Sequence, residues 1–228
     1  MPEINLIHGD CMEGLKNTPD KFYDLAVVDP PYVVGANSGR FGRRKETSKS
    51  YSLKSYVNKL PEKDYFRELF RVSKNQIIWG ANYYPQYLNH SGWIVWDKEN
   101  EYNEQLSDCE LAYQSFNKRV NIFRFRWGGF VKDKGSFSPI ETPEIIHPNQ
   151  KPLALYKWLL TKYAKQGDKI LDTHLGSGSI AIACYDLGFD LTAFELDKDY
   201  FEAMIKRFEN HKKQLTIDFP NSYRNPPE

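Results

Sequence analysis

Cysteine is scarce and scattered in this sequence. Only three cysteines occur among 228 residues, at Cys11, Cys109 and Cys184, and an odd, dispersed set does not form the paired framework of a small secreted domain. The five histidines show no metal-ligand spacing with one another or with the cysteines. These absences argue against a disulfide-stapled protein, and they predict a reducing, cytoplasmic setting and no metal site.

Long apolar runs are also missing. A membrane-spanning helix needs roughly 18 or more consecutive apolar residues, and no stretch of this sequence approaches that length. The amino terminus lacks the charged-then-apolar pattern of a secretory signal. We therefore expect no membrane contact, and the length suits a single domain over residues 1–228.

The net charge is small, at +1, but it is unevenly distributed. Residues 35–60 hold seven Lys or Arg and one acid, and residues 117–134 hold six Lys or Arg and one acid. Two concentrated basic segments in a near-neutral chain favour a polyanion bound by particular loops, with a pair of solvated loops as the alternative. The candidate nucleic-acid contacts are Arg40, Arg43, Arg44, Lys45, Lys49, Lys118, Arg119, Arg124 and Arg126.

The most informative stretch runs from Asp24 to Tyr32, with the sequence DLAVVDPPY. Its apolar run has the pattern of a buried strand in a parallel sheet. The two prolines that follow cannot continue a hydrogen-bonded ladder, so the chain must leave the sheet there. Asp29 and Tyr32 are thereby held on a stiff loop at the carboxyl end of a strand, where open α/β sheets bind ligands. An ordinary strand-ending turn is the alternative for Asp-Pro-Pro alone.

The Asp-Pro-Pro-Tyr tetrapeptide suits methylation of an exocyclic amine on a nucleic-acid base. The nitrogen lone pair of adenine or cytosine is delocalised into the ring, and acceptors for its two N–H groups return electron density to the nitrogen. The base must leave the helix to react, and an aromatic ring can then stack on it. We therefore assign the acceptor roles to Asp29 and the carbonyl of Pro30, rigidity to Pro31, and stacking to Tyr32.

A second site is expected where Asp172-Thr-His-Leu-Gly-Ser-Gly leads from a strand into a helix. A glycine-rich turn lets the backbone approach a nucleoside closely. The third glycine of the dinucleotide fingerprint is absent, which disfavours NAD. Glu195 ends the next strand, where a carboxylate is placed to accept hydrogen bonds from ribose hydroxyls. An exposed strand-end acid is the alternative for Glu195.

Strand and helix patterns alternate at both ends of the chain, which predicts a parallel sheet with helices on both faces. Residues 33–60 have the composition of a long mobile loop. The pattern around Asp10 alone indicates a helix N-cap, and the closeness of the middle strands predicts antiparallel hairpins. Helices are expected to begin at Pro61, Pro152, Gly178 and Asp199, and strands are expected at 4–7, 24–28, 75–79, 92–97, 110–116, 120–127, 169–172 and 191–194.

Together these segments resemble the DNA amino-methyltransferases that use S-adenosylmethionine. The similarity is to the group whose catalytic motif precedes the cofactor motif, typified by N6-adenine enzymes. Asp29 to Tyr32 resembles their catalytic motif, and His147 to Pro152 resembles the segment before their cofactor motif. Asp172 to Gly178 and Glu195 match the methionine- and ribose-binding elements, and Gly9 to Cys11 matches the element that contacts the adenine of the cofactor. The matches span nearly the whole chain in the family's order.

The resemblance implies an α/β, Rossmann-like methyltransferase fold with a circularly permuted motif order. Its sheet would be seven-stranded and mostly parallel with an antiparallel hairpin, and the strands at 4–7 and 24–28 would flank the pair at 169–172 and 190–194. The family usually has Phe where this chain has His174, and it often has a separate recognition domain whose work segments 33–60 and 97–140 would do here. The implied cofactor residues are Asp10, Cys11, Lys151, Asp172, His174, Gly176, Gly178 and Glu195.

The implied activity is site-specific methylation of adenine N6 in double-stranded DNA, in a restriction–modification or phage setting, with S-adenosylmethionine as cofactor. Methylation of cytosine N4 is the nearest alternative because the two amines have similar geometry, although the cytosine enzymes more often carry Ser in place of Asp29. A catalytically idle DNA-binding subunit and an RNA-modifying enzyme are the alternatives from other classes. The sequence leaves open whether the protein is a monomer or a homodimer.

Overall fold

The structure is a computed structural model that describes residues 1–32, 60–89, 92–99, 107–128, 131–132, 146–147 and 149–217. The expected mobile loop, with the candidate DNA contacts Arg40, Arg43, Arg44, Lys45 and Lys49, lies outside these residues. Across the described residues, no helix is both long enough and apolar enough to cross a membrane.

The described strands alternate with helices near both ends of the chain, as the sequence predicts. The strands are β1 (Ile4–His8), β2 (Tyr23–Val28), β3 (Ser73–Trp79), β4 (Gly92–Asp97), β5 (Cys109–Gln114), β6 (Val120–Arg124), β7 (Trp127–Gly128), β8 (Val131–Lys132), β9 (Lys169–Asp172) and β10 (Asp190–Glu195). The helices are α1 (Cys11–Asn17), α2 (Lys63–Val72), α3 (Leu153–Tyr163), α4 (Ser179–Leu187) and α5 (Lys198–Ile217), with short 3₁₀ turns at Ala81–Tyr83 and Pro85–Tyr87.

Eight of these strands form one sheet in the order β1-β10-β9-β2-β3-β5-β4-β6, and β7 and β8 form a separate pair. The first five strands are parallel, with β1 beside β10 and β2 beside β9, as expected. The expected count of seven strands is therefore one too low for the described sheet. The additional strand is β6, which pairs with β4 in parallel at the outer edge.

The expectation of successive hairpins is wrong for β5 and β6. A short turn at residues 115–119 joins them, but β4 lies between them in the sheet. The turn therefore crosses over the start of β4, where the backbone N–H of Trp93 donates to the carbonyl of Arg119. The Gln114 amide group fills the turn: its Nε2 donates to the carbonyls of Asn117 and Arg119, and its Oε1 accepts from the backbone N–H of Phe116.

Gly92 makes this crossing possible. A Cβ at position 92 would lie 2.3 Å from the backbone oxygens of Asn117 and Arg119 and 1.8 Å from Gln114 Nε2. Gly92→Ala should therefore destabilise the protein by about 1–3 kcal/mol, as overpacking of a well-filled site does. Urea unfolding of the two proteins checks this, and an unchanged free energy of unfolding would mean that the turn is held loosely.

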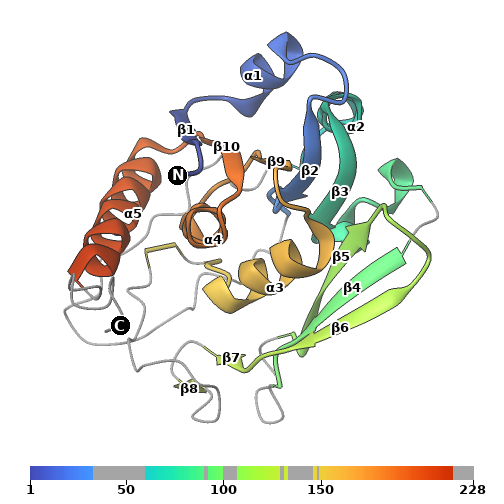
Figure 1. Cartoon of the computed structure of the whole chain (residues 1–228). Helices are drawn as coiled ribbons and strands as arrows, with labels where there is room; N and C mark the ends of the chain where they lie inside the picture. Colours follow the sequence, from blue (N-terminus) through green and yellow to red (C-terminus); the bar gives the residue numbers. More distant parts are fainter. Residues whose placement is uncertain are drawn as a thin grey trace, which may run out of the picture.

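Helices cover both faces of the parallel part of the sheet (Figure 1). The helices α3, α4 and α5 pack on one face, and α1 and α2 pack on the other. The side chains of β2 alternate between the two cores, with Leu25 and Val27 on the α3 side and Ala26 and Val28 on the α1 side. This explains the uninterrupted apolar run before Asp29, because a strand buried on both faces needs apolar residues at every position.

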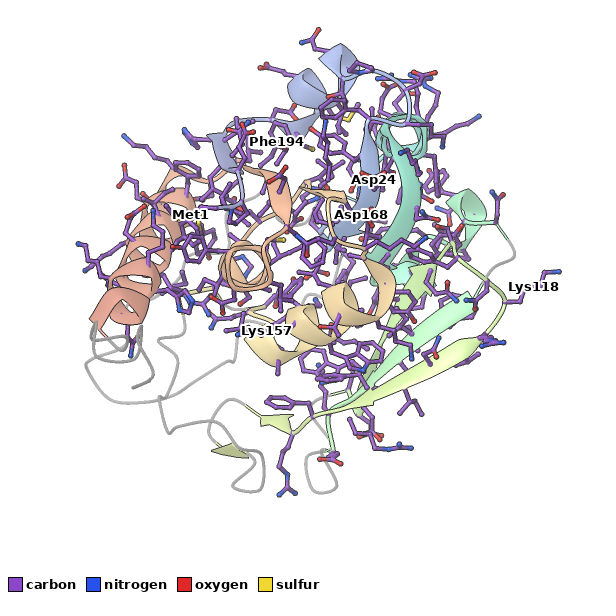
Figure 2. The ribbon with its side chains drawn as sticks, in the orientation of Figure 1. Met1, Asp24, Lys118, Lys157, Asp168 and Phe194 are labelled. Atoms are coloured by element: carbon purple, nitrogen blue, oxygen red, sulfur yellow. The ribbon has the colours of Figure 1, made fainter. Side chains whose placement is uncertain are left out.

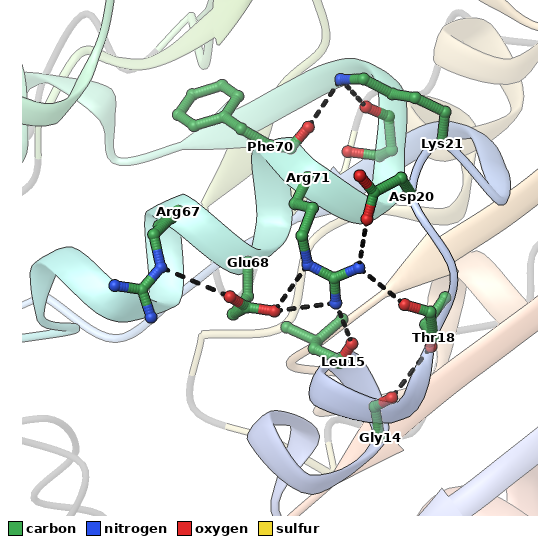
Figure 3. Close-up of polar contacts among 10 residues, drawn as sticks. Gly14, Leu15, Thr18, Asp20, Lys21, Arg67, Glu68, Phe70 and Arg71 are labelled. Carbon is green, nitrogen blue, oxygen red and sulfur yellow. Dashed lines mark hydrogen bonds and ion pairs between the residues drawn. The ribbon is translucent and has the colours of Figure 1, made fainter.

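Arg71, near the end of α2, ties that helix to the end of α1 (Figure 3). Its guanidinium donates to the carbonyls of Leu15 and Thr18 and forms ion pairs with Asp20 and Glu68. The last carbonyls of a helix lack partners of the regular helical ladder; Arg71 shares the Leu15 carbonyl with the N–H of Thr18 and supplies a donor to the Thr18 carbonyl. The connection that leads from α1 into β2 is thereby fixed against α2.

Several boundaries differ from the sequence expectation. The helix α2 begins at Lys63, with Glu62 as N-cap, so Pro61 lies just before the helix. Strand β5 ends at Gln114 because that side chain enters the turn, and β6 ends at Arg124. Helix α5 begins at Lys198, one residue before the expected start at Asp199, and its 20 residues extend to Ile217.

Candidate active site

The predicted site residues follow the carboxyl ends of four neighbouring parallel strands. Asp10 follows β1, Glu195 ends β10, Asp172 ends β9 and Asp29 follows β2. Backbone hydrogen bonds join the loops: Gly9 N–H donates to the Glu195 carbonyl, and Leu175 N–H donates to the Phe194 carbonyl, each at 2.9 Å. The strand ends that carry these four residues therefore lie together along one side of the sheet.

Asp29 is the most constrained carboxylate of this edge. Its Oδ2 accepts a hydrogen bond from the ammonium of Lys151, which is only 3% exposed. Its Oδ1 is buried and has no hydrogen-bond partner among the described residues. Because an unpaired buried acceptor costs about 1–3 kcal/mol, this oxygen is an open position for an N–H donor from a ligand.

A second carboxylate shares the ammonium of Lys151. Glu110, on β5, lies with Oε2 3.1 Å from Lys151 Nζ and with Oε1 2.7 Å from Lys98 Nζ. Burial raises the pKa of Glu110, but the two ammonium groups outweigh burial and lower it to about 2. Burial also raises the pKa of Asp29, and the negative charge of Glu110 raises it further, against the effect of Lys151.

The loop after Asp29 is held by tyrosines that the sequence did not point to. The Tyr84 hydroxyl lies within donating distance of the carbonyls of Pro30 and Pro31, at 2.9 and 2.7 Å. The ring of Tyr32 stacks on Tyr83, with centroids 4.7 Å apart and planes 7° from parallel. A carbonyl oxygen has two lone pairs, so the carbonyl of Pro30 keeps one acceptor position for a ligand.

Glu195 and the glycine-rich turn form the second half of the edge. The carboxylate of Glu195 accepts the backbone N–H of Gly176 at Oε2 and that of Asp197 at Oε1, each at 2.8 Å. An ionised carboxylate has about four acceptor positions, so both oxygens can still accept ribose hydroxyls. Gly176 and Gly178 have φ of 52° and 72°, the left-handed region that favours glycine.

The residues of this half fit the S-adenosylmethionine that the sequence resemblance implies. Asp172 is 2% exposed, and burial raises its pKa to about 8. A cationic ligand would supply the positive charge that stabilises its ionised form, and S-adenosylmethionine carries a sulfonium and an ammonium. The carboxylates of Asp172 and Glu195 therefore suit a ligand that has a cationic end and a ribose.

His174 takes the place of the Phe that is usual in the resembled family, and the structure shows how it can do so. Burial lowers the pKa of His174 to about 4, so its ring is neutral near pH 7. The ring packs edge-on against Tyr65, with centroids 5.5 Å apart, and its Nδ1 lies 2.9 Å from the Thr173 hydroxyl. His174 thus packs as a neutral aromatic ring.

The remaining implied cofactor residues differ in their exposure and in their partners. Asp10 is the N-cap of α1 and accepts the N–H of Met12, as its local pattern predicts, and it remains exposed. The thiol of Cys11 is buried, which raises its pKa to about 12 and makes it unreactive. Lys151 was assigned to the cofactor from the resemblance, but in the structure its ammonium pairs with Asp29 and Glu110.

The candidate DNA contacts that the structure describes lie on two opposite sides of the sheet, one at the carboxyl ends and one at the amino ends of the parallel strands. Arg124 pairs with Asp97 at the carboxyl end of β4, and Arg126 donates to the Glu99 carbonyl beyond it, on the same edge as Asp29. Lys118 and Arg119 lie on the β5–β6 turn, at the edge where β2 and β9 begin. Figure 2 shows Lys118 projecting outward from that turn.

A prediction about the cofactor follows from the position of Glu195. Glu195→Ala should weaken S-adenosylmethionine binding by about 1.5–3 kcal/mol, the scale of hydrogen bonds to a charged group. Calorimetric titration of the two proteins measures this. Glu202→Ala, which removes an exposed carboxylate of α5, is the matched control and should leave the affinity unchanged. Equal affinities for Glu195→Ala and the parent would make Glu195 a structural residue only.

Among the described residues, no group of three or more His, Cys, Asp or Glu side chains is arranged to hold a metal ion.

Comparison with known proteins gives one family match and several relatives. Residues 131–207 match the family described as "DNA methylase". The type II methyltransferase M.HpaI of Haemophilus parainfluenzae is 25% identical over 243 residues, which cover 90% of this chain and 74% of that protein.

Solved structures share the fold. The M1.HpyAVI–SAM complex superimposes with a TM-score of 0.59 at 21% identity, over 90% of this chain and 98% of that one. The cytosine-N4-specific PvuII DNA methyltransferase also gives a TM-score of 0.59, at 14% identity, over 93% of this chain and 91% of that one. Taken with the strand-end residues described above, these matches show that the chain is similar in sequence and in fold to S-adenosylmethionine-dependent DNA methyltransferases.

Proposed function

We propose that this chain transfers a methyl group from S-adenosylmethionine to N6 of adenine at specific sites in double-stranded DNA. The observation that carries the proposal is the buried, unpartnered Oδ1 of Asp29 beside the Asp-Pro-Pro-Tyr turn. An exocyclic amine has two N–H groups, and Asp29 Oδ1 with the carbonyl of Pro30 offers two acceptors next to the Tyr32 ring.

The described residues divide the work of this reaction. S-adenosylmethionine, when bound, supplies an electrophilic methyl group on its sulfonium, and Glu195, Asp172 and the turn at Gly176 are the residues that would hold it. Asp29 and the carbonyl of Pro30 orient the amine and return electron density to its nitrogen, and Tyr32 stacks on the flipped base. As the N–C bond forms and the S–C bond breaks, the nitrogen releases one proton, which Asp29 can accept and pass to water.

Positioning should supply most of the rate enhancement. Holding two reactants in a near-attack geometry can lower a barrier by roughly 7–11 kcal/mol, whereas proton transfer to one placed side chain typically contributes about 10²–10⁴-fold. The buried ion pair of Asp29 and the tyrosine contacts of its loop suit this role, because they fix the acceptors before the base arrives.

Cytosine N4 is the alternative target, since the PvuII enzyme that shares the fold is described as specific for that position. Asp29 favours adenine, because the resembled cytosine enzymes more often carry Ser there. The test incubates the purified protein with mixed-sequence duplex DNA and S-adenosylmethionine, and then identifies the methylated nucleosides by mass spectrometry. We expect N6-methyldeoxyadenosine, and N4-methyldeoxycytidine as the sole product would refute the adenine assignment.

The two edges of the sheet give a prediction for DNA binding. Replacing both Arg124 and Arg126 with Ala should reduce the salt dependence of log affinity by about 0.9 for each phosphate that is no longer neutralised, because both arginines lie on the edge that holds Asp29. Replacing Lys118 and Arg119 with Ala removes the same charge from the opposite edge and is the matched control. Titrations of DNA at several salt concentrations compare the two. If the Arg124/Arg126 variant has the same slope of log affinity against log salt concentration as the parent protein and the control, the arginines of the active edge do not bind phosphates.

A further inference from the structure

Four side chains of alternating charge form a continuous series that ends at the open oxygen of Asp29. Lys98, just after β4, pairs with Glu110 of β5 at 2.7 Å, and Glu110 lies 3.1 Å from Lys151, which in turn bonds Asp29. The side chains of Lys98, Glu110 and Asp29 are 16%, 20% and 17% exposed, and that of Lys151 is 3% exposed. The series carries no net charge.

We propose that Lys151 is a positioning residue for Asp29, and that Glu110 and Lys98 hold Lys151 in place for that task. The inference rests on the proposed function, because it assigns Lys151 to the target amine and not to the cofactor. In this arrangement Lys151 occupies Oδ2 of Asp29, so that Oδ1 alone faces the amine.

The geometry explains why an ammonium suits this position. A carboxylate held at one oxygen cannot rotate to exchange its two oxygens without breaking a buried ion pair. The ammonium itself is held on three sides, by Asp29, by Glu110 and by the ring of Trp79, whose centroid lies 5.5 Å from Nζ. Because Glu110 comes from β5 and Asp29 follows β2, the position of Lys151 depends on the assembled sheet.

The charges around Asp29 also set its protonation. Burial raises the pKa of Asp29, Glu110 adds to this, and Lys151 and Lys98 lower it. Burial alone would lower the pKa of Lys151, but Asp29 and Glu110 raise it well above its ordinary value, so the ammonium stays charged. The other ionisable groups that interact with Asp29 are Tyr32, Tyr84, Tyr156 and Asp172; the three phenols have raised pKa values and stay neutral.

The signs of these effects give a test that a purely structural role would not pass. Asp29 must be ionised to accept the amine, so methyl transfer should increase with pH through its pKa. Lys151→Met removes a positive charge and raises that pKa, which moves the acid limb of the kcat profile to higher pH. Glu110→Gln removes a negative charge and lowers that pKa, which moves the limb to lower pH. We also expect Lys151→Met to lower kcat at the plateau by about 10²-fold, the cost of a reactant displaced by roughly 1 Å.

The experiment measures the pH dependence of kcat at saturating DNA and S-adenosylmethionine, with calorimetric S-adenosylmethionine affinity and thermal melting for each variant. The control is Lys157→Met, which breaks the ion pair of Lys157 with Asp186 on the α3–α4 surface and should leave the profile and kcat unchanged. Should Lys151→Met not fold, Lys98→Met keeps the Lys151 side chain but removes one of the positive charges that lower the pKa of Asp29, and it must also move the acid limb to higher pH.

Opposite shifts with unchanged S-adenosylmethionine affinity would support the proposal. The proposal would be overturned if the acid limbs of the two variants moved in the same direction or did not move, and Lys151 would then have a structural role only. A weakened S-adenosylmethionine affinity in Lys151→Met would also overturn it and return Lys151 to a cofactor role. Failure of the proposed function would give a different result, because the parent protein itself would then methylate no amino group of DNA in the same assay.

Discussion

Asp29→Asn lowers kcat for methyl transfer by about 10²–10⁴-fold, the range for loss of one placed acid–base group, and leaves S-adenosylmethionine affinity unchanged. The reason lies in Lys151, whose ammonium requires an acceptor from residue 29. The amide oxygen of Asn would face Lys151, and the amide NH₂ would take the place of Oδ1. A donor would then meet the N–H of the target amine, where the parent protein offers an acceptor.

Asp24→Asn is the matched control for this experiment. Asp24 lies on the same strand at its opposite end and pairs with Lys74 at 2.6 Å, so its substitution also breaks a carboxylate–ammonium pair. We expect Asp24→Asn to keep kcat near that of the parent. Single-turnover assays with labelled S-adenosylmethionine measure both variants. Full turnover in Asp29→Asn would contradict the role of Asp29.

Gly80→Ala lowers kcat/KM for DNA methylation by about 10²-fold, because a misplacement of roughly 1 Å in a reacting group can cost that much. A Cβ at position 80 would lie 2.6 Å from Cδ1 and 2.9 Å from Cε1 of Tyr32. The Tyr32 ring would have to move, and with it the surface on which the flipped base stacks. The S-adenosylmethionine affinity should not change, because Gly80 belongs to the catalytic half of the edge.

Gly188→Ala separates this effect from backbone strain. Both glycines have positive φ, 66° at Gly80 and 78° at Gly188, so each alanine costs roughly 1–2 kcal/mol of stability. Gly188 ends α4, and the nearest atom to its added Cβ is Gln166 Nε2 at 3.7 Å. We expect the two variants to lose similar stability in thermal melts, with full methylation only in Gly188→Ala. Equal methylation in both would mean that Tyr32 tolerates the added methyl group.

Local patterns in the sequence were sufficient to predict the loop that carries Asp29 and the glycine-rich turn before α4. In both, a short apolar strand is followed by residues that cannot continue it, prolines after β2 and glycines after β9. The alternation of strands and helices also predicted the parallel sheet with helices on both of its faces. These features depend on residues close together in the chain, where spacing and backbone preference are decisive.

The contacts that refine the site could not be predicted in this way. Lys151 and Glu110 are 41 residues apart, and Tyr84 reaches the carbonyls of Pro30 and Pro31 from a separate turn. No spacing rule relates such residues, because the fold alone brings them together. The placement of β6 beside β4 was missed for the same reason: Gly92 permits the crossing, and a single glycine before a strand carries no topological signal.

The acceptor role of Asp29 is tested most directly by a crystal structure of this protein with duplex DNA and a non-reactive analogue of S-adenosylmethionine. We predict an adenine turned out of the helix, with its N6 within hydrogen-bond distance of Asp29 Oδ1 and the Pro30 carbonyl, its ring against Tyr32, and Lys151 still on Asp29 Oδ2. A base that remains stacked in the duplex, or whose amine lies away from Asp29, would contradict the account.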